Sequence, residues 1–186
     1  MTMIAFVGAC SGSTADEAAA PAPTVTAPTD KIISPASLTI GQAVPAPEEK
    51  PVLTLTGKIS TGNQKGALVL DQPTLERLGV RQVRLYEPWI KENTEFRGVW
   101  LQDLIAVAGV KPDAVKLHIV ALDDYAVDLS LAEVRAGGIM VATRAGDGST
   151  IPIDKGGPTR IVFMDGVKAG VNPDQWVWSI KTIDVV

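Results

Sequence analysis

Residues 153–185, IDKGGPTRIVFMDGVKAGVNPDQWVWSIKTIDV, decide the fold that we expect for this chain. The segment opens with a Gly-Gly-Pro turn that carries Lys155 and Arg160, and this turn leads into the apolar run Ile161-Val162-Phe163-Met164. A polar loop follows, and a Trp-rich strand closes the chain. Two cations beside a glycine turn make this segment the first candidate for a binding site.

Composition excludes several classes of protein. The chain has 186 residues, of which 46% are hydrophobic, and this predicts one domain with some additional chain. The net charge is −4, with acids and bases interspersed, which excludes the basic surface of a nucleic-acid-binding protein. Cys10 is the only cysteine and His118 the only histidine, so no disulfide framework and no metal site built from these residues is expected.

The first ten residues resemble a bacterial lipobox, because the small residues of Val7-Gly8-Ala9 stand just before Cys10. Such a cysteine becomes the lipidated first residue of the mature protein. A secretory signal usually begins with a basic region, whereas the first positively charged residue here is Lys31. We expect residues 1–10 to be a lipoprotein signal that anchors the protein to a membrane through Cys10, in the periplasm or cell envelope. The alternative is an untargeted N-terminus with a free thiol.

Residues 11–50 are dominated by Ala, Pro, Thr and Ser and contain no aromatic residue. Such a segment cannot bury enough apolar surface to offset the entropy that ordering costs. The sequence therefore predicts a flexible, partly polyproline tether over residues 11–50, with the folded domain over residues 51–186.

The domain has many short strands and few helices. Helices are predicted for residues 72–78, 101–108 and 131–136, the last opened by a capping box of Ser130 and Glu133. Strands are predicted for residues 52–56, 83–86, 115–122, 126–129, 139–144 and 149–153. Because the strands and helices do not alternate, we expect an α+β domain with mixed, mostly antiparallel sheets. His118 falls on the outward face of its strand and is expected at the surface.

Several motifs resemble, in order, those of the molybdopterin-binding domain of sulfite-oxidase-type oxidoreductases. They are a tryptophan after a strand, the start of a helix, an Asp-Tyr turn, G-G-P-x-R and a closing W-x-W-x-I: Trp89, Phe96 to Leu104, Asp124-Tyr125, Gly156 to Arg160, and Trp176 to Ile180. The resemblance spans residues 52–186 and implies the fold of that family.

The resemblance also implies a cofactor, and here the sequence departs from the family. In that family a cysteine thiolate binds molybdenum, and the position corresponds to about Leu85, in a domain that has no cysteine. Many members carry a histidine where this chain has Lys155, whereas Arg160 matches the family's arginine. Leucine has no donor atom for a metal. The expectation is therefore no bound cofactor, with molybdopterin as the alternative.

Two groups of residues are candidates for binding a small anionic or planar ligand. Lys155, Gly156, Gly157 and Arg160 can form an anion cradle, since glycines let backbone N–H groups approach a phosphate and the cations supply charge. The alternative is a tight turn whose cations are solvated or paired with nearby aspartates.

Aromatic residues form the second group. Tyr86, Trp89, Tyr125, Trp176 and Trp178 can wall a flat, partly apolar pocket. The alternative is that they fill the core, with Trp89 and Trp178 as the expected exceptions.

Three functions remain open at this point. The preferred one is an exported binding module that has lost its metal and holds a small ligand or an envelope protein. The alternatives are an active molybdopterin-dependent oxidoreductase and a structural envelope lipoprotein. Because the sequence points to no catalytic residue, it leaves open whether the protein is an enzyme.

Overall fold

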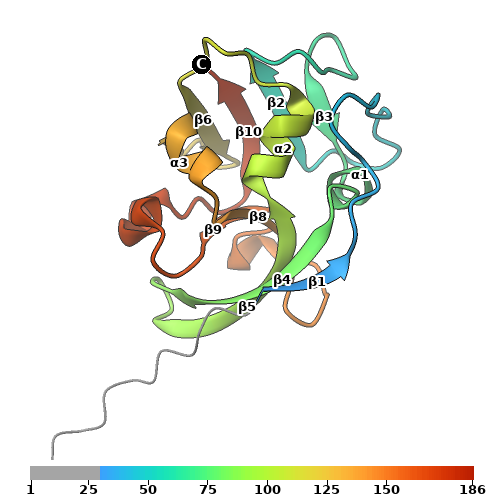
Figure 1. The fold of residues 1–186 in the computed structure, drawn as a ribbon. Helices are drawn as coiled ribbons and strands as arrows, with labels where there is room; N and C mark the ends of the chain where they lie inside the picture. The colour runs from blue at the N-terminus through green and yellow to red at the C-terminus, as the bar shows by residue number, and fades with distance from the viewer. Residues whose placement is uncertain (1–29) are drawn as a thin grey trace, which may run out of the picture.

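The computed structural model describes residues 30–186, which form two five-stranded sheets and three short α-helices (Figure 1). Sheet A has the order β1-β4-β5-β8-β9 and sheet B the order β3-β2-β10-β6-β7. The buried residues of both sheets and of the helices form one hydrophobic core. Apart from one parallel pair, the strand pairs are antiparallel. The predicted α+β class with mixed, mostly antiparallel sheets is confirmed.

Sheet A contains the long β4–β5 hairpin, whose register runs from Arg81 opposite Gly98 to Glu87 opposite Glu92. Its strands are β1 (Asp30–Ser34), β4 (Val80–Glu87), β5 (Glu92–Trp100), β8 (Ile139–Ala145) and β9 (Arg160–Phe163). Gly98 is required here, because a Cβ at this position would lie 2.2 Å from the Val141 carbonyl oxygen of β8.

Sheet B is built around β10, which pairs in parallel with β2 on one side and antiparallel with β6 on the other. Its strands are β2 (Leu53–Gly57), β3 (Leu68–Leu70), β6 (Lys116–Ala121), β7 (Ala126–Ser130) and β10 (Ile180–Val185). In β6, Leu117, Ile119 and Ala121 are buried, as the alternation predicts. His118 lies on the opposite face, where its Nδ1 is 2.8 Å from Asp128 Oδ1.

The three helices form close to where they are predicted. They are α1 (Gln72–Glu76), α2 (Leu101–Ala108) and α3 (Leu131–Ala136). Helix α2 ends at Gly109 in the left-handed conformation, and α3 begins with the expected capping box. Short 3₁₀ turns are η1 (Ile153–Lys155), η2 (Lys168–Val171) and η3 (Pro173–Gln175). None of the helices within residues 30–186 has the length and hydrophobicity needed to cross a membrane.

Two predicted strands differ from the structure. Residues 149–153 make only one isolated bridge, between Arg144 and Thr150, before η1 begins. The Trp-rich segment is also not a strand, because Ser179 has a φ of 50° and so interrupts extended backbone just before β10. Trp176 and Trp178 therefore lie in an irregular segment. Their side chains do not have to follow the two-residue alternation of a strand.

The predicted domain boundary at residue 51 is also wrong. Strand β1 pairs with β4, and Leu38 and Val44 are buried in the core. The backbone N–H groups of Glu48 and Glu49 both donate to Asp71 Oδ2, at 2.8 and 3.0 Å. The folded unit thus includes residues 30–50, because scattered apolar residues and one buried carboxylate hold a Pro-rich segment in place. The predicted lipobox with Cys10 and residues 11–29 of the predicted tether lie outside the described residues.

Candidate functional site

The strongest candidate site is an aromatic pocket of about 470 Å³. Three segments meet there: the β4–β5 turn, the β6–β7 turn and the irregular segment before β10. Its lining residues are Trp89, Ile90, Ala121, Asp123, Tyr125, Trp176 and Trp178. Four of the five aromatic residues considered as candidates for a pocket wall therefore lie together, although they come from segments far apart in the sequence.

The β6–β7 turn brings Asp123 and Tyr125 to the pocket. Asp124 takes a φ of 64°, and the backbone N–H of Tyr125 donates to Asp123 Oδ1 at 3.1 Å. This bond within the turn is typical of aspartate, whose side chain often accepts from the backbone two residues further on. The Tyr125 hydroxyl donates to the carbonyl oxygen of Asp174 in η3, at 2.9 Å. The ring is thus fixed at its outer end while 46% of the residue stays exposed.

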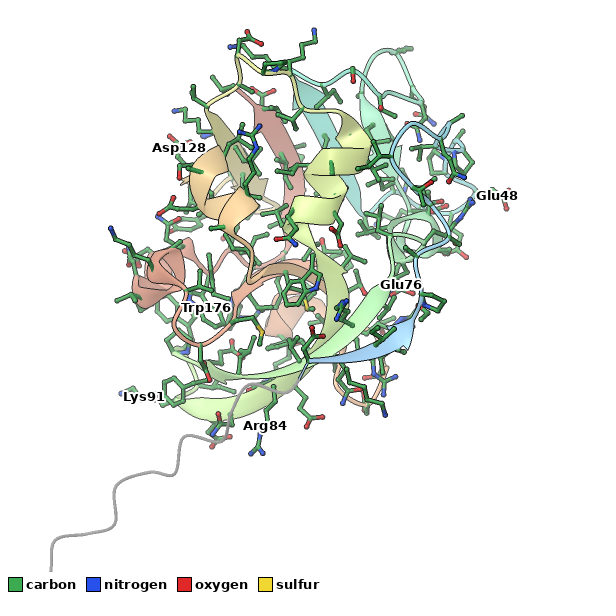
Figure 2. All side chains as sticks on the ribbon, viewed as in Figure 1. Glu48, Glu76, Arg84, Lys91, Asp128 and Trp176 are labelled. Carbon is green, nitrogen blue, oxygen red and sulfur yellow. The ribbon has the colours of Figure 1, made fainter. Side chains whose placement is uncertain are left out.

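Trp176 forms the inner wall of the pocket. Its indole Nε1 donates to the Gly170 carbonyl at 2.9 Å, and its ring tilts against Phe163 with 5.5 Å between centroids. Figure 2 shows Trp176 within the body of the domain, whereas Lys91 stands at the outer end of the β4–β5 hairpin. Trp89, in the turn of that hairpin, is 51% exposed. The pocket therefore has a rigid floor and an open aromatic rim.

Tyr86 is the candidate wall residue that lies elsewhere. It is half-exposed on β4, its backbone N–H donates to Asp165 Oδ1 at 3.0 Å, and its side chain lines a neighbouring hollow beside Phe163 and Val171.

Beneath Trp178 lies a buried ion pair between Arg160 and Glu87. The two residues are 3% and 2% exposed, and Arg160 Nη2 is 2.5 Å from Glu87 Oε1. Arg160 Nη1 also donates to the Lys155 carbonyl at 3.1 Å. The guanidinium carbon lies 4.5 Å from the ring centroid of Trp178 and 5.1 Å from that of Phe96. Burial lowers the pKa of Arg160 and the charge of Glu87 opposes this, but a guanidinium stays protonated in proteins.

Sequence reasoning does not place Glu87 in the site, nor the pocket residues Ile90, Ala121 and Asp123. Glu87 stands just before Pro88 and an exposed turn, where a glutamate is usually exposed. The alternation of β4 is the signal that could have found it, since Val83, Leu85 and Glu87 share one buried face of the strand.

The glycine turn does not form the predicted anion cradle, because its own backbone occupies the donors. The N–H groups of Lys155 and Gly157 donate to the Pro152 carbonyl at 3.0 and 2.9 Å, and that of Gly156 donates to Ile153 at 3.0 Å. The side chain of Lys155 is exposed at the surface. The turn instead makes room for an aromatic ring: a Cβ on Gly156, whose φ is 85°, would lie 2.8 Å from Trp178 Cγ.

The predicted site residues thus divide into two groups. Trp89, Tyr125 and Trp178 line the pocket, whereas Gly156 and Arg160 support Trp178 from behind it. Lys155 contributes its carbonyl oxygen to Arg160, and a Cβ on Gly157 would clash with the Ile151 carbonyl oxygen.

Comparison with known proteins gives the family. The profile of the oxidoreductase molybdopterin binding domain matches residues 75–185. The chain belongs to this family. No curated protein matches it. Among solved structures, the sulfane dehydrogenase SoxCD from Paracoccus pantotrophus is similar over 72% of this chain, with a TM-score of 0.54 and 19% identity. The chain spans 37% of the length of that protein. At this coverage and identity, the similarity shows the fold alone.

The residues present do not fit the family's cofactor. A metal–pterin cofactor needs a place for an anionic phosphate and, in this family, a thiolate for the metal. Leu85 is fully buried and aliphatic, Arg160 is neutralised by Glu87, and the turn's N–H groups are used internally. Within residues 30–186 no three His, Cys, Asp or Glu side chains gather as a set that could hold a metal ion.

Proposed function

We propose that this chain is a binding module on the molybdopterin-binding fold, without a bound metal, that holds a small organic ligand in its aromatic pocket. The buried Arg160–Glu87 pair is the observation that carries the proposal. The family's arginine is present, but its charge is neutralised inside the protein and covered by two rings. It is therefore not offered to the phosphate of a cofactor.

The pocket supports a ligand that is mainly apolar. Its volume lies within the range of about 300–1,000 Å³ typical of small-molecule sites, and aromatic residues make up most of its lining. Trp176 and Tyr125 are held by hydrogen bonds that do not need a ligand. A wall fixed before binding lowers the entropy that a ligand loses when it binds.

The proposal extends to where the protein works. The lipobox-like residues before Cys10 and the Pro-rich segment that follows support a lipid anchor in the periplasm or cell envelope. An envelope protein that contacts the exposed Trp89 rim is a second class of partner on this proposal.

Family membership favours one other function, that of an active molybdopterin-dependent oxidoreductase. On that alternative the pterin dithiolene would hold molybdenum without a protein thiolate. It requires Arg160 to exchange Glu87 for a phosphate, which would leave the Glu87 carboxylate buried without its partner.

Purification from a host that makes the pterin cofactor separates these functions. We expect molybdenum at the background level of a protein purified in the same way, and no pterin fluorescence from the denatured protein. Stoichiometric molybdenum with pterin would establish the oxidoreductase alternative instead.

The same preparation tests ligand binding by tryptophan fluorescence, with a panel of small planar heterocycles. We expect Trp89→Ala to weaken binding about tenfold, because it removes a wall that stacks on the ligand. Tyr86→Ala is the matched control, since Tyr86 is similarly exposed but lines the neighbouring hollow. Absence of both binding and metal would leave the structural role.

A further inference from the structure

We infer that the aromatic pocket selects an organic cation, of the methylated-ammonium class, an inference that rests on the proposed function and names its ligand. The observation behind it is the combination of four aromatic rings with a single acid in one pocket. Trp89, Tyr125, Trp176 and Trp178 supply the rings, and Asp123 supplies the acid.

The rings favour positive charge over negative charge. The face of an aromatic ring carries negative electrostatic potential, and a cation within about 6 Å of a ring centroid is attracted to it. Trp178 already takes part in one such contact, with the Arg160 guanidinium at 4.5 Å from its centroid. Two or more rings around one small volume are the arrangement that recognises quaternary ammonium groups.

The charged lining points the same way. Among residues 30–186, Asp123 is the only carboxylate on the pocket wall, and no lysine or arginine lines the pocket. One of its oxygens, Oδ1, accepts from the Tyr125 backbone, which fixes the carboxylate beside that ring. An anion would meet this carboxylate without a compensating cation on the wall, whereas a cation would pair with it.

The buried pair neutralises a positive charge behind the pocket that would otherwise repel a cation. Arg160 lies directly behind Trp178, but Glu87 Oε1 at 2.5 Å from its Nη2 compensates the positive charge. The net charge of −4 for the chain adds a weak attraction at long range. Glu87 thus has two effects. It occupies the guanidinium of Arg160, so that Arg160 does not bind a phosphate, and it neutralises the charge behind the pocket.

The test compares choline with its uncharged isostere 3,3-dimethylbutan-1-ol, by isothermal titration calorimetry and tryptophan fluorescence on the full chain. The two molecules have nearly the same shape and differ in charge. We expect choline to bind at least about tenfold more tightly, because the charge adds cation–π attraction to the same apolar contact. We expect Asp123→Asn to weaken choline binding about threefold or more and to leave the isostere unchanged. Asp154→Asn, which changes an exposed acid outside the lining, is the matched control.

Each outcome decides the inference. Selective choline binding that is lost in Trp89→Ala and weakened in Asp123→Asn supports it. Equal binding of both molecules, weakened by Trp89→Ala, overturns the cation class and leaves the binding module standing. Failure of both molecules, when planar heterocycles still quench the tryptophan fluorescence, also overturns the cation class alone. Failure of every ligand overturns the inference together with the proposed function.

Discussion

At the scale of single residues, Glu87 decides what Arg160 can do. Both side chains are almost fully enclosed, and Arg160 Nε and Trp178 Nε1 are buried without a hydrogen-bond partner in the described part of the chain. A buried pair of this kind is costly to desolvate, and removal of one partner leaves an uncompensated charge in the interior. The pair is therefore a fixed part of the core, even though it lies next to the pocket.

We expect Glu87→Gln to reduce the free energy of unfolding by about 3–5 kcal/mol, because Arg160 stays charged and loses its partner. Urea unfolding followed by tryptophan fluorescence measures the change. Glu95→Gln, on the exposed part of β5, is the control and should change stability by less than about 1 kcal/mol.

The double variant Glu87→Leu/Arg160→Met separates a lost charge pair from lost packing. We expect it to recover most of the stability, since apolar residues of similar volume often replace a buried pair without loss. A double variant as unstable as Glu87→Gln would contradict the electrostatic explanation.

Sequence reasoning identified three of the seven pocket residues as binding residues but misplaced the site's chemistry. Trp89, Tyr125 and Trp178 are predictable because large aromatic residues next to predicted turns are candidates for a binding surface. The sequence left the anion cradle and the tight turn as alternatives, because the sequence G-G-P does not show whether its N–H groups are already hydrogen-bonded. Glu87 was missed because its partner stands 73 positions away.

At the scale of elements, Asp71 joins α1 to the segment before β2. It caps α1 by accepting from the Thr74 N–H at 2.9 Å, and its other oxygen accepts from Glu48 and Glu49. Burial raises the pKa of this carboxyl, but the hydrogen bonds outweigh burial and lower the pKa to about 2, from a usual value of 3.8. One side chain therefore holds two elements that the sequence assigned to different parts of the protein.

This pKa predicts loss of stability in acid. A carboxyl whose pKa is depressed on folding stabilises the protein above its unfolded pKa, and that contribution is lost as the pH falls from about 4 to about 2. We expect Asp71→Asn to cost about 2 kcal/mol near neutral pH and progressively less within that window. Urea midpoints of both proteins across this pH range give the difference, and a difference that does not change with pH would contradict the assignment.

Elements with strong local patterns were predictable, and elements made by distant pairing were not. Helix α2 was placed correctly because its apolar spacing and its glycine stop are both local. Strand β5 was not predicted as a strand, since its first residues, Glu92, Asn93 and Glu95, are exposed and polar. They are extended only because β4 pairs with them.

At the scale of the whole molecule, the folded unit begins earlier than its composition suggests. Leu38 and Val44 lie in the core, and β1 covers one edge of sheet A. We expect a chain that starts at residue 51 to be less stable than one that starts at residue 30 by about 3–6 kcal/mol, since two aliphatic side chains leave the core. Thermal and urea unfolding of the two chains measure this difference. Equal stability would mean that residues 30–50 belong to the tether that composition predicts.

The parallel pairing of β2 with β10 has a consequence for folding kinetics. Thr56 Oγ1 donates to Asp184 Oδ1 at 2.8 Å, across 128 positions of the chain. The β4–β5 and β6–β7 hairpins are local and can form early, but sheet B cannot close until segments from nearly opposite ends of the domain meet. Folding is slow because so long a loop must close before its contacts form. Until then the strand edges of the early hairpins are unpaired, and a second unfolded chain can pair with them and aggregate.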